Sequence, residues 1–252
     1  LVKGDPSDRR HFLDHLIVMR LPRLGGVKAD YDRVLKQRNT LLKTAGRRSN
    51  VEISTLDIWD ENLARTGGQL VAARLALLDA LGPHATDAYR DVAAGAAADR
   101  QVVSFAYKPS VPGIEELRDP DDLGKALLDE IGRRRREALE RGISLVGPHR
   151  DDVVLSIGDL PAKGYASHGE SWSLALALRL AAFALLREDG DDPILILDDV
   201  FAELDSRRRS QLAARVASAE QMLETAAVEG DVPPELVGQS FDVASAVVTP
   251  RG

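Results

Sequence analysis

The chain has 252 residues and is 44% hydrophobic, which is enough to bury a sizeable core in one large domain or in two. It contains no cysteine, so disulfides and thiolate metal sites are excluded, and we expect a protein of the reducing cytoplasm. The net charge of −7 argues against bulk electrostatic attraction to nucleic acid, although a local basic patch can still bind phosphates.

The first third of the chain is expected to be mainly helical. Apolar side chains recur at helical spacing over residues 27–43 and again over 56–81, with a polar loop at 46–50 between them. Gly82 and Pro83 are expected to end the second helix, because proline cannot continue the backbone hydrogen-bond ladder. Two antiparallel helices joined by a short loop predict an αα-hairpin.

The rest of the chain is expected to mix strands with helices. A strand at 101–107 and a charged helix at 121–141 come first, followed by a β-hairpin formed by 152–157 and 163–166. The remaining predicted elements are, in chain order, an apolar helix from Ser167 to 188, a strand at 194–197, a helix at 206–219 and strands at 222–226 and 241–248. Alternation of strand and helix in this last third is typical of an α/β domain.

The predicted helix after Ser167 is the most apolar part of the chain. Its most apolar stretch, 172–186, is interrupted by Arg179 and falls short of about 18 uncharged apolar residues, the length of a membrane span. We therefore expect no contact with a membrane.

An apolar run, Ile194 to Leu197, leads directly into Asp198 and Asp199. Such a run predicts a strand that is buried on both faces, and open parallel sheets bind ligands at the carboxyl ends of their strands. Two acids at that position fit a Walker B strand, in which one aspartate helps to hold Mg²⁺ and the next acid positions water. A strand that runs out into a polar turn is the alternative, and the strand alone leaves both interpretations open.

The motif Ser167-His-Gly-Glu170 stands at the start of the apolar helix. A helix amino terminus offers unpaired N–H groups and a positive dipole end, and Gly169 would let the backbone approach a phosphate closely. The same four residues also match a capping box, in which Ser167 caps the helix and Glu170 reaches back to it. A phosphate site and a purely structural cap are therefore both compatible with this motif.

Several stretches of the chain together form a pattern that is more specific than any single motif: 3–14, 31–39 with 41–43, 145–152, 161–170, 197–205 and 225–227. This combination resembles the RecF family, recombination mediators among the ABC-type ATPases that are related to structural-maintenance-of-chromosomes heads. The resemblance implies an α/β fold, an ABC-type ATPase half-head with an inserted, mainly helical lid domain. The expected domains are the end of a first head segment at 1–28, the lid at 29–143 and the carboxyl-terminal part of the head at 144–252.

The resemblance also implies roles for individual residues. Ser167, Gly169 and Glu170 fall on the signature motif, which in this family touches the ATP of the partner subunit, although the usual motif has Gln at the position of Glu170. The roles implied for the acids are Mg²⁺ binding for Asp198, orientation of the attacking water for Asp199, and a place in the D-loop at the dimer seam for Asp205.

The function implied by the resemblance is that of a recombination mediator. Such a protein binds DNA and ATP, dimerises with ATP, hydrolyses ATP slowly in a DNA-dependent way, and supports recombinase loading at gaps or junctions between single- and double-stranded DNA with RecO and RecR. A non-hydrolytic DNA-binding clamp or scaffold is the first alternative. Another head of the structural-maintenance-of-chromosomes type is the second, and the short lid argues against it.

No Gly-x-x-x-x-Gly-Lys-[Ser/Thr] phosphate loop occurs in the sequence, and Gly124-Lys125-Ala126 lacks both the loop glycine and the hydroxyl. The family's phosphate loop precedes the segment that matches residues 3–14, so we expect it to belong to a segment outside this chain. The chain alone is then expected to bind ATP very weakly and not to hydrolyse it, and the strand at Ile194 is expected to expose apolar surface.

Basic residues form two groups that differ in their acidic neighbours. Arg133 to Arg136 alternate with acids at helical spacing and predict a solvated, ion-paired face. The better candidates for DNA contacts are the basic residues of the predicted helix at 27–43 and the loop after it: Arg33, Lys36, Arg38, Lys43, Arg47 and Arg48. His149 and Arg150 follow a Gly-Pro turn and are expected to face the junction between the domains.

Overall fold

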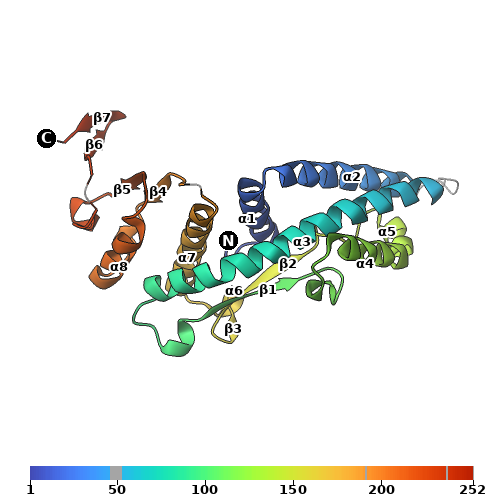
Figure 1. The fold of residues 1–252 in the computed structure, drawn as a ribbon, viewed down its shortest axis with the longest axis horizontal. Coiled ribbons are helices and arrows are strands. Elements are labelled where there is room, and N and C mark those ends of the chain that lie inside the picture. The colour runs from blue at the N-terminus through green and yellow to red at the C-terminus, as the bar shows by residue number, and fades with distance from the viewer. Residues whose placement is uncertain (46–52, 191, 237, 252) are drawn as a thin grey trace.

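The computed structural model describes residues 1–45, 53–190, 192–236 and 238–251 and shows an elongated α/β molecule (Figure 1). Its helices are α1 (Pro6–Arg20), α2 (Arg23–Ala45), α3 (Ile53–Val92), α4 (Pro120–Arg133), α5 (Arg135–Arg141), α6 (Ala162–Tyr165), α7 (His168–Glu188) and α8 (Ser206–Val216). Its strands are β1 (Val103–Lys108), β2 (Asp152–Ile157), β3 (Leu160–Pro161), β4 (Leu195–Asp198), β5 (Met222–Thr225), β6 (Phe241–Ala244) and β7 (Val247–Pro250).

The helices α2 and α3 lie side by side, as the predicted αα-hairpin requires, but the predicted end of α3 at Gly82 and Pro83 is wrong (Figure 1). The helix is 40 residues long and passes through Pro83 to Val92. Pro83 removes one backbone hydrogen bond, whereas Ala85 and Tyr89 beyond it are fully buried, and this burial favours continuing the helix. The predicted loop at 46–50 lies outside the described residues.

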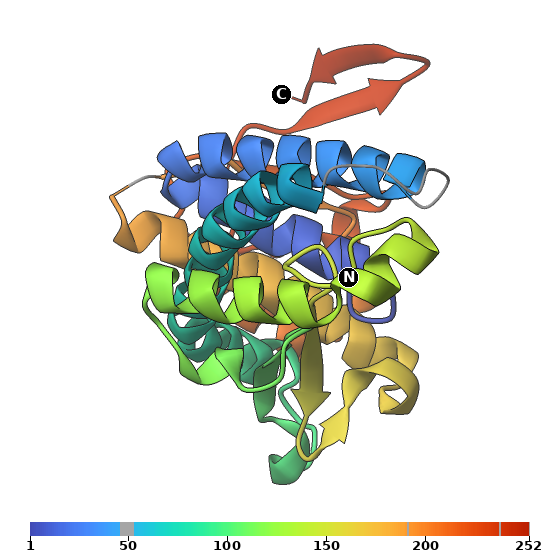
Figure 2. The same ribbon diagram turned by 90° about the vertical axis from the view of Figure 1, so that its right-hand side faces the viewer.

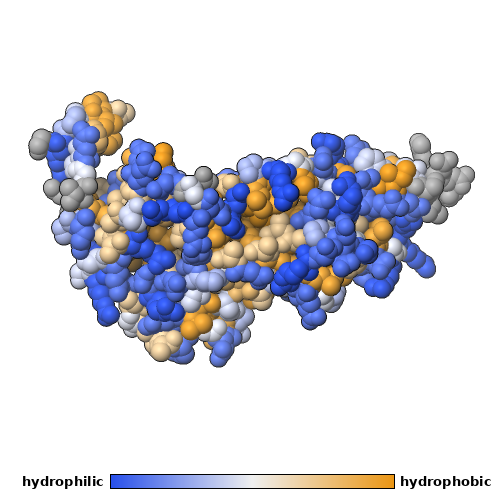
Figure 3. All heavy atoms as spheres, viewed as in Figure 1, coloured by the Kyte–Doolittle hydropathy of each residue, from blue (hydrophilic) through white to orange (hydrophobic). Residues whose placement is uncertain are grey.

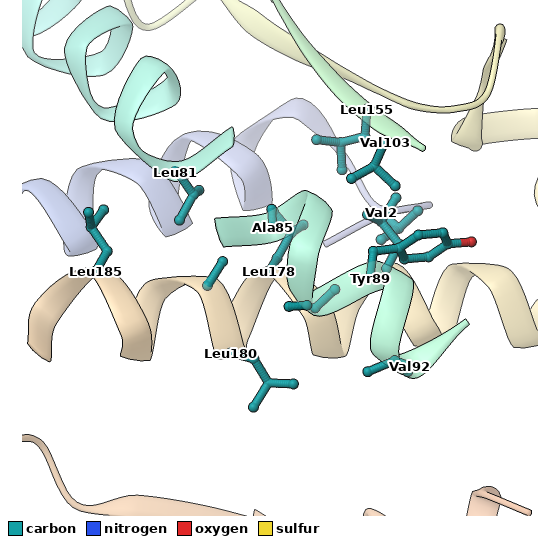
Figure 4. Packing of buried hydrophobic residues seen from close by; sticks show 14 of the residues in the cluster. Val2, Leu81, Ala85, Tyr89, Val92, Val103, Leu155, Leu178, Leu180 and Leu185 are labelled. Carbon is teal, nitrogen blue, oxygen red and sulfur yellow. The ribbon is translucent and has the colours of Figure 1, made fainter. Parts of the chain in front are cut away.

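Two large hydrophobic clusters follow the length of α3, and a small third one, Leu42, Leu56 and Ala138, includes its amino-terminal end. The larger one packs the carboxyl-terminal half of α3 against β1, β2 and α7 (Figure 4), and it also includes buried residues of α1 and α8. The other packs the amino-terminal half of α3 against α2 and α4. Because both clusters use α3, that helix is the common support of the lid and of the ATPase half-head expected from the sequence.

The first sheet joins β1, β2 and β3 in antiparallel order, with Val103 opposite Ile157. The predicted second strand of the hairpin, 163–166, is wrong: the strand is the short β3 before it, and 162–165 form one helical turn with Gly164 at φ 95°. The predicted charged helix is interrupted at Arg134, where φ −95° and ψ 7° depart from helical values, and so becomes α4 and α5.

The expected single strand at 241–248 is instead the hairpin β6–β7, which projects from the body at the end of the chain (Figure 2). Ser245 and Ala246 form its two-residue turn with φ 48° and 62°, the positive values that this kind of hairpin turn needs. Its side chains are exposed, Val243 by 73%, and they form an apolar patch at one end of the molecule (Figure 3).

The strand β4 pairs only with β5, in parallel, among the described residues. Leu197 is 3% exposed against the core, whereas Ile194 is 55% exposed and Ile196 64% exposed on the other side. The prediction that this strand is buried on both faces is therefore wrong for the chain as it stands. The predicted exposure of apolar surface at Ile194 is confirmed.

The helix α7 has the length and hydropathy of a membrane-spanning helix over its most apolar 18 residues. Half of that stretch is buried inside the molecule, and α7 packs against α3. Its apolar composition is accounted for by the core in which Leu174, Ala177 and Ala181 are fully buried.

A buried polar network fills the junction around residues 145–152. Tyr31 of α2 and His149 Nδ1 share a hydrogen bond of 2.6 Å, and burial lowers the pKa of His149 to about 4. Asp151 accepts hydrogen bonds of 2.6 Å from the Tyr107 hydroxyl and from the Ser110 amide. His149 thus lies where α2 meets this turn. The division of the chain into domains at 28/29 and 143/144 stays a prediction. The strands β1 and β2 lie on opposite sides of the second of these boundaries and pair with each other.

Candidate functional site

The start of α7 is held by a reciprocal cap. The Glu170 amide donates to Ser167 Oγ at 3.2 Å, and the Ser167 amide donates to Glu170 Oε2 at 2.9 Å. Ser167 and Gly169 are exposed, and nothing lies within 4 Å of the position that a Cβ on Gly169 would take. The capping box is therefore formed, and it leaves the open side of the helix terminus accessible to an anion.

Arg100 joins this cap from the segment between α3 and β1. Its Nε and one terminal nitrogen donate to Glu170 Oε1 at 2.9 and 2.6 Å. The hydrogen bond from the Ser167 backbone, together with Arg100, holds the pKa of Glu170 below its ordinary value. Nothing in the sequence pointed to Arg100, because the partners are 70 positions apart and belong to no common motif.

Replacing Ser167 with alanine tests what the cap does. Loss of the hydroxyl removes one hydrogen bond at the helix terminus and is expected to lower the free energy of unfolding by about 0.5–2 kcal/mol. If the motif has the role that the resemblance implies, a longer polypeptide that includes the phosphate loop should also dimerise more weakly with ATP than that destabilisation explains. Urea unfolding and sedimentation with ATP measure the two effects, and an unchanged dimerisation would leave Ser167 with a capping role alone.

The second group of predicted residues lies at the carboxyl end of β4. Asp198 Oδ1 accepts a hydrogen bond of 2.5 Å from the Thr225 hydroxyl at the end of β5. Asp199 follows with a φ of 52°, and its amide donates to the Thr225 carbonyl and hydroxyl oxygens, both at 3.1 Å. Both aspartates are exposed, so the strand end presents two carboxylates to solvent. Thr225 fixes the carboxylate of Asp198 and the backbone amide of Asp199.

Asp205 is the amino-terminal cap of α8. Its Oδ1 accepts a hydrogen bond of 3.0 Å from the Arg208 amide, and Oδ2 lies 3.5 Å from Arg208 Nε. Its side chain is mostly exposed, which leaves it accessible at a surface. A structural cap explains these contacts, and the role at a dimer seam stays a prediction.

The two groups make no direct contact in the structure. Ser167 caps the amino end of α7, whereas Asp198 and Asp199 lie at the end of β4, which follows that helix in the chain. Within the described ranges, no hydrogen bond or ion pair connects Ser167, Gly169 or Glu170 with Asp198, Asp199 or Asp205. One chain therefore presents two half-sites, an anion-binding helix terminus and a pair of carboxylates.

No cluster of three or more metal-ligating side chains occurs in the part of the chain that the structure describes. Mg²⁺ does not require one, because it usually takes one or two carboxylates and completes its shell with phosphate oxygens and water. The exposed carboxylate of Asp198, oriented by Thr225, fits such a ligand.

The structure divides the predicted DNA-binding residues. Arg38 has to be removed from the group, because it is 1% exposed and bonded to Asp60 Oδ1 at 2.5 Å and to Ser144 Oγ at 2.9 Å. A buried guanidinium in two such contacts cannot reach a DNA phosphate. Lys36 and Lys43 are exposed on α2, as is Arg33 beside Asp30, while Arg47 and Arg48 lie outside the described residues.

No family model matches the chain. The DNA replication and repair protein RecF of a Nocardioides species is 53% identical over 296 residues, which cover 98% of this chain and 70% of that protein. The chain belongs to the RecF family. RecF proteins of Streptomyces avermitilis and Frankia alni are 54% and 56% identical, each over 98% of this chain and 66% of the relative. The chain thus spans about two thirds of the length of these RecF relatives.

Solved RecF structures share the fold. The structure of the recombination mediator protein RecF-ATPrS in the RecFOR pathway is 25% identical in sequence, with a TM-score of 0.85. The match covers 100% of this chain and 65% of the chain in that structure. The RecF-ATP structure of the same pathway is 24% identical with a TM-score of 0.86 and covers 64% of that chain. The fold class expected from the sequence, α/β with the ABC-type head, is confirmed.

Proposed function

We propose that this chain is the lid and the later half of the ATPase head of a recombination mediator. The complete protein binds ATP and DNA, dimerises with ATP and supports recombinase loading at DNA gaps or junctions, with RecR and RecO as partners, in the cytoplasm. The lid would comprise 29–143, between head segments 1–28 and 144–252. The observation that carries this proposal is the pair of separated half-sites at the start of α7 and the end of β4, within a RecF fold.

The half-sites support complementary roles in an ATP-bound dimer. Ser167 and the exposed backbone at Gly169 can donate hydrogen bonds to a phosphate of the ATP held by the other subunit. Asp198 would hold Mg²⁺, which neutralises phosphate charge when bound, and Asp199 would orient the attacking water. Thr225 fixes the carboxylate of Asp198 and the backbone of Asp199, so it supports both roles.

The DNA contact would use the exposed cations of α2. Lys36, Lys43 and Arg33 point away from the core, and such side chains gain affinity for phosphates through counterion release. Arg33 is paired with Asp30 at 3.1 Å, so part of its charge is already neutralised. Lys36 and Lys43 are therefore the residues chosen to test the DNA contact.

The test is ATP-dependent dimerisation and DNA binding of a RecF polypeptide that includes the phosphate loop. We expect Mg-ATP to drive the monomer to a dimer in sedimentation and to tighten binding to gapped DNA. The double replacement Lys36→Ala and Lys43→Ala should weaken DNA binding and flatten its salt dependence without affecting dimerisation. A protein that stays monomeric with Mg-ATP and binds DNA equally with and without it would refute the proposed function.

A further inference from the structure

The contact between Arg100 and Glu170 has no counterpart in the roles that the RecF resemblance implies. Arg100 ends a short 3₁₀ turn, Ala98–Arg100, and donates two hydrogen bonds to one carboxylate oxygen of Glu170. A third donor of the same guanidinium reaches the Ile157 carbonyl at 3.2 Å. The two side chains are 25% and 26% exposed, so the pair is largely shielded from solvent.

The surroundings hold this arginine in place. The side chain of Gln101 donates to the Ala96 carbonyl at 2.7 Å and so closes the turn that carries Arg100. Tyr89 of α3 lies among the core side chains (Figure 4), and its hydroxyl has no hydrogen-bond partner within the described residues. Burial and the charge of Glu170 raise the pKa of Tyr89 to about 12.

The same segment also contacts the helix that follows the predicted D-loop. Arg208 donates to the Ala94 carbonyl at 3.3 Å, and Arg215 pairs with Asp91 at 2.5 Å. The end of α3 and the turn after it therefore touch the start of α7 and, through Arg208 and Arg215, both ends of α8. This fixes the turn against the two elements that carry Ser167 and Asp205.

A carboxylate at the start of α7 poses an electrostatic problem for a phosphate site. The helix terminus carries the equivalent of about half a positive charge, which one unpaired carboxylate would more than cancel. Arg100 supplies the compensating charge and holds one oxygen of Glu170, while the other oxygen accepts the Ser167 amide. The Ser167 hydroxyl and the exposed backbone then remain available to an incoming anion.

We propose that Arg100 is a positioning residue of the signature motif, which turns the Glu170 carboxylate into the cap and neutralises it so that the start of α7 can accept an ATP phosphate. This role rests on the proposed function and deepens it. Arg100 need not touch the nucleotide, since it acts through Glu170.

The test is a double-mutant cycle in a RecF polypeptide that includes the phosphate loop. Arg100→Ala should weaken ATP-driven dimerisation by about tenfold, which lies within the range of coupling energies usual for two residues in direct contact. In a background of Glu170→Gln, which keeps the cap but removes the charge, the same Arg100→Ala change should cost less than about threefold. Arg90→Ala, an exposed arginine of α3, is the control and should change nothing. Equal losses in both backgrounds would reduce Arg100 to a structural role.

A second measurement needs no nucleotide. In the 252-residue chain, the pKa of the Glu170 carboxyl, followed by NMR, should rise when Arg100 is replaced by alanine. An unchanged pKa would show that Arg100 does not form the ion pair with Glu170, and would leave the proposed function intact. Failure of the unmodified protein to dimerise with ATP would instead refute the proposed function, and with it the role of Arg100.

Discussion

Replacing Asp199 with asparagine is expected to abolish ATP turnover in a RecF polypeptide that includes the phosphate loop, and to prolong its ATP-bound dimer. Asp199 lies directly after the predicted Mg²⁺ ligand Asp198, where a carboxylate can orient the attacking water. Asparagine keeps the shape but loses the charge and the proton-accepting oxygen. We expect turnover to fall by at least about a hundredfold, which is typical for the loss of a positioned acid or base.

The backbone makes asparagine the right replacement at this position. Asp199 has a φ of 52°, which asparagine tolerates better than other non-glycine residues, and its amide still reaches Thr225. The fold should therefore survive, whereas alanine would add backbone strain to the loss of function. Asp159→Asn, in the exposed turn between β2 and β3, is a matched control that should leave turnover unchanged.

The same variant separates an ATPase cycle from a clamp that uses ATP only as a switch. Steady-state phosphate release and dimer lifetime are measured together with and without gapped DNA. A variant that turns over ATP at the unmodified rate would remove Asp199 from the mechanism. Lost turnover with unchanged recombinase loading would favour the clamp, in which hydrolysis is incidental.

Features that depend on neighbouring residues could be predicted from the sequence. The cap at Ser167 and Glu170 follows from spacing within one helical turn, and the strand before Asp198 follows from an unbroken apolar run. The capping-box spacing predicted that the Glu170 carboxylate reaches back to the cap, and that contact is present. These are local interactions, so their pattern is visible without knowledge of the fold.

Features that depend on distant packing could not be predicted in this way. The sequence places Arg38 among the surface cations of α2, but in the structure its side chain is buried and bonded to Asp60 of α3 and to Ser144. Pro83 has the local character of a helix end, yet the core beyond it outweighs one lost hydrogen bond. The charge of Arg100 is compensated only because the fold brings it to Glu170.

Replacing Arg74 with methionine is expected to lower the free energy of unfolding of the chain by about 3–5 kcal/mol, the usual loss when one partner of a buried ion pair is removed. Arg74 of α3 bonds to both carboxylate oxygens of Asp14 on α1, at 2.7 and 2.9 Å, and to the Pro148 carbonyl at 2.7 Å. It is 2% exposed, so its loss leaves a buried carboxylate and a carbonyl without their donors.

Two further variants make this expectation specific to the buried pair. Arg90→Met breaks an ion pair with Asp87 whose side chains are 58% and 64% exposed, and should change stability by less than about 1 kcal/mol. The double variant Arg74→Met with Asp14→Leu removes both charges and should recover most of the loss, because an apolar pair needs no compensation. Urea unfolding at constant m-value measures all three. If Arg74→Met cost no more than Arg90→Met, the joint between α1, α3 and the Pro148 turn would owe its stability to apolar packing rather than to this ion pair.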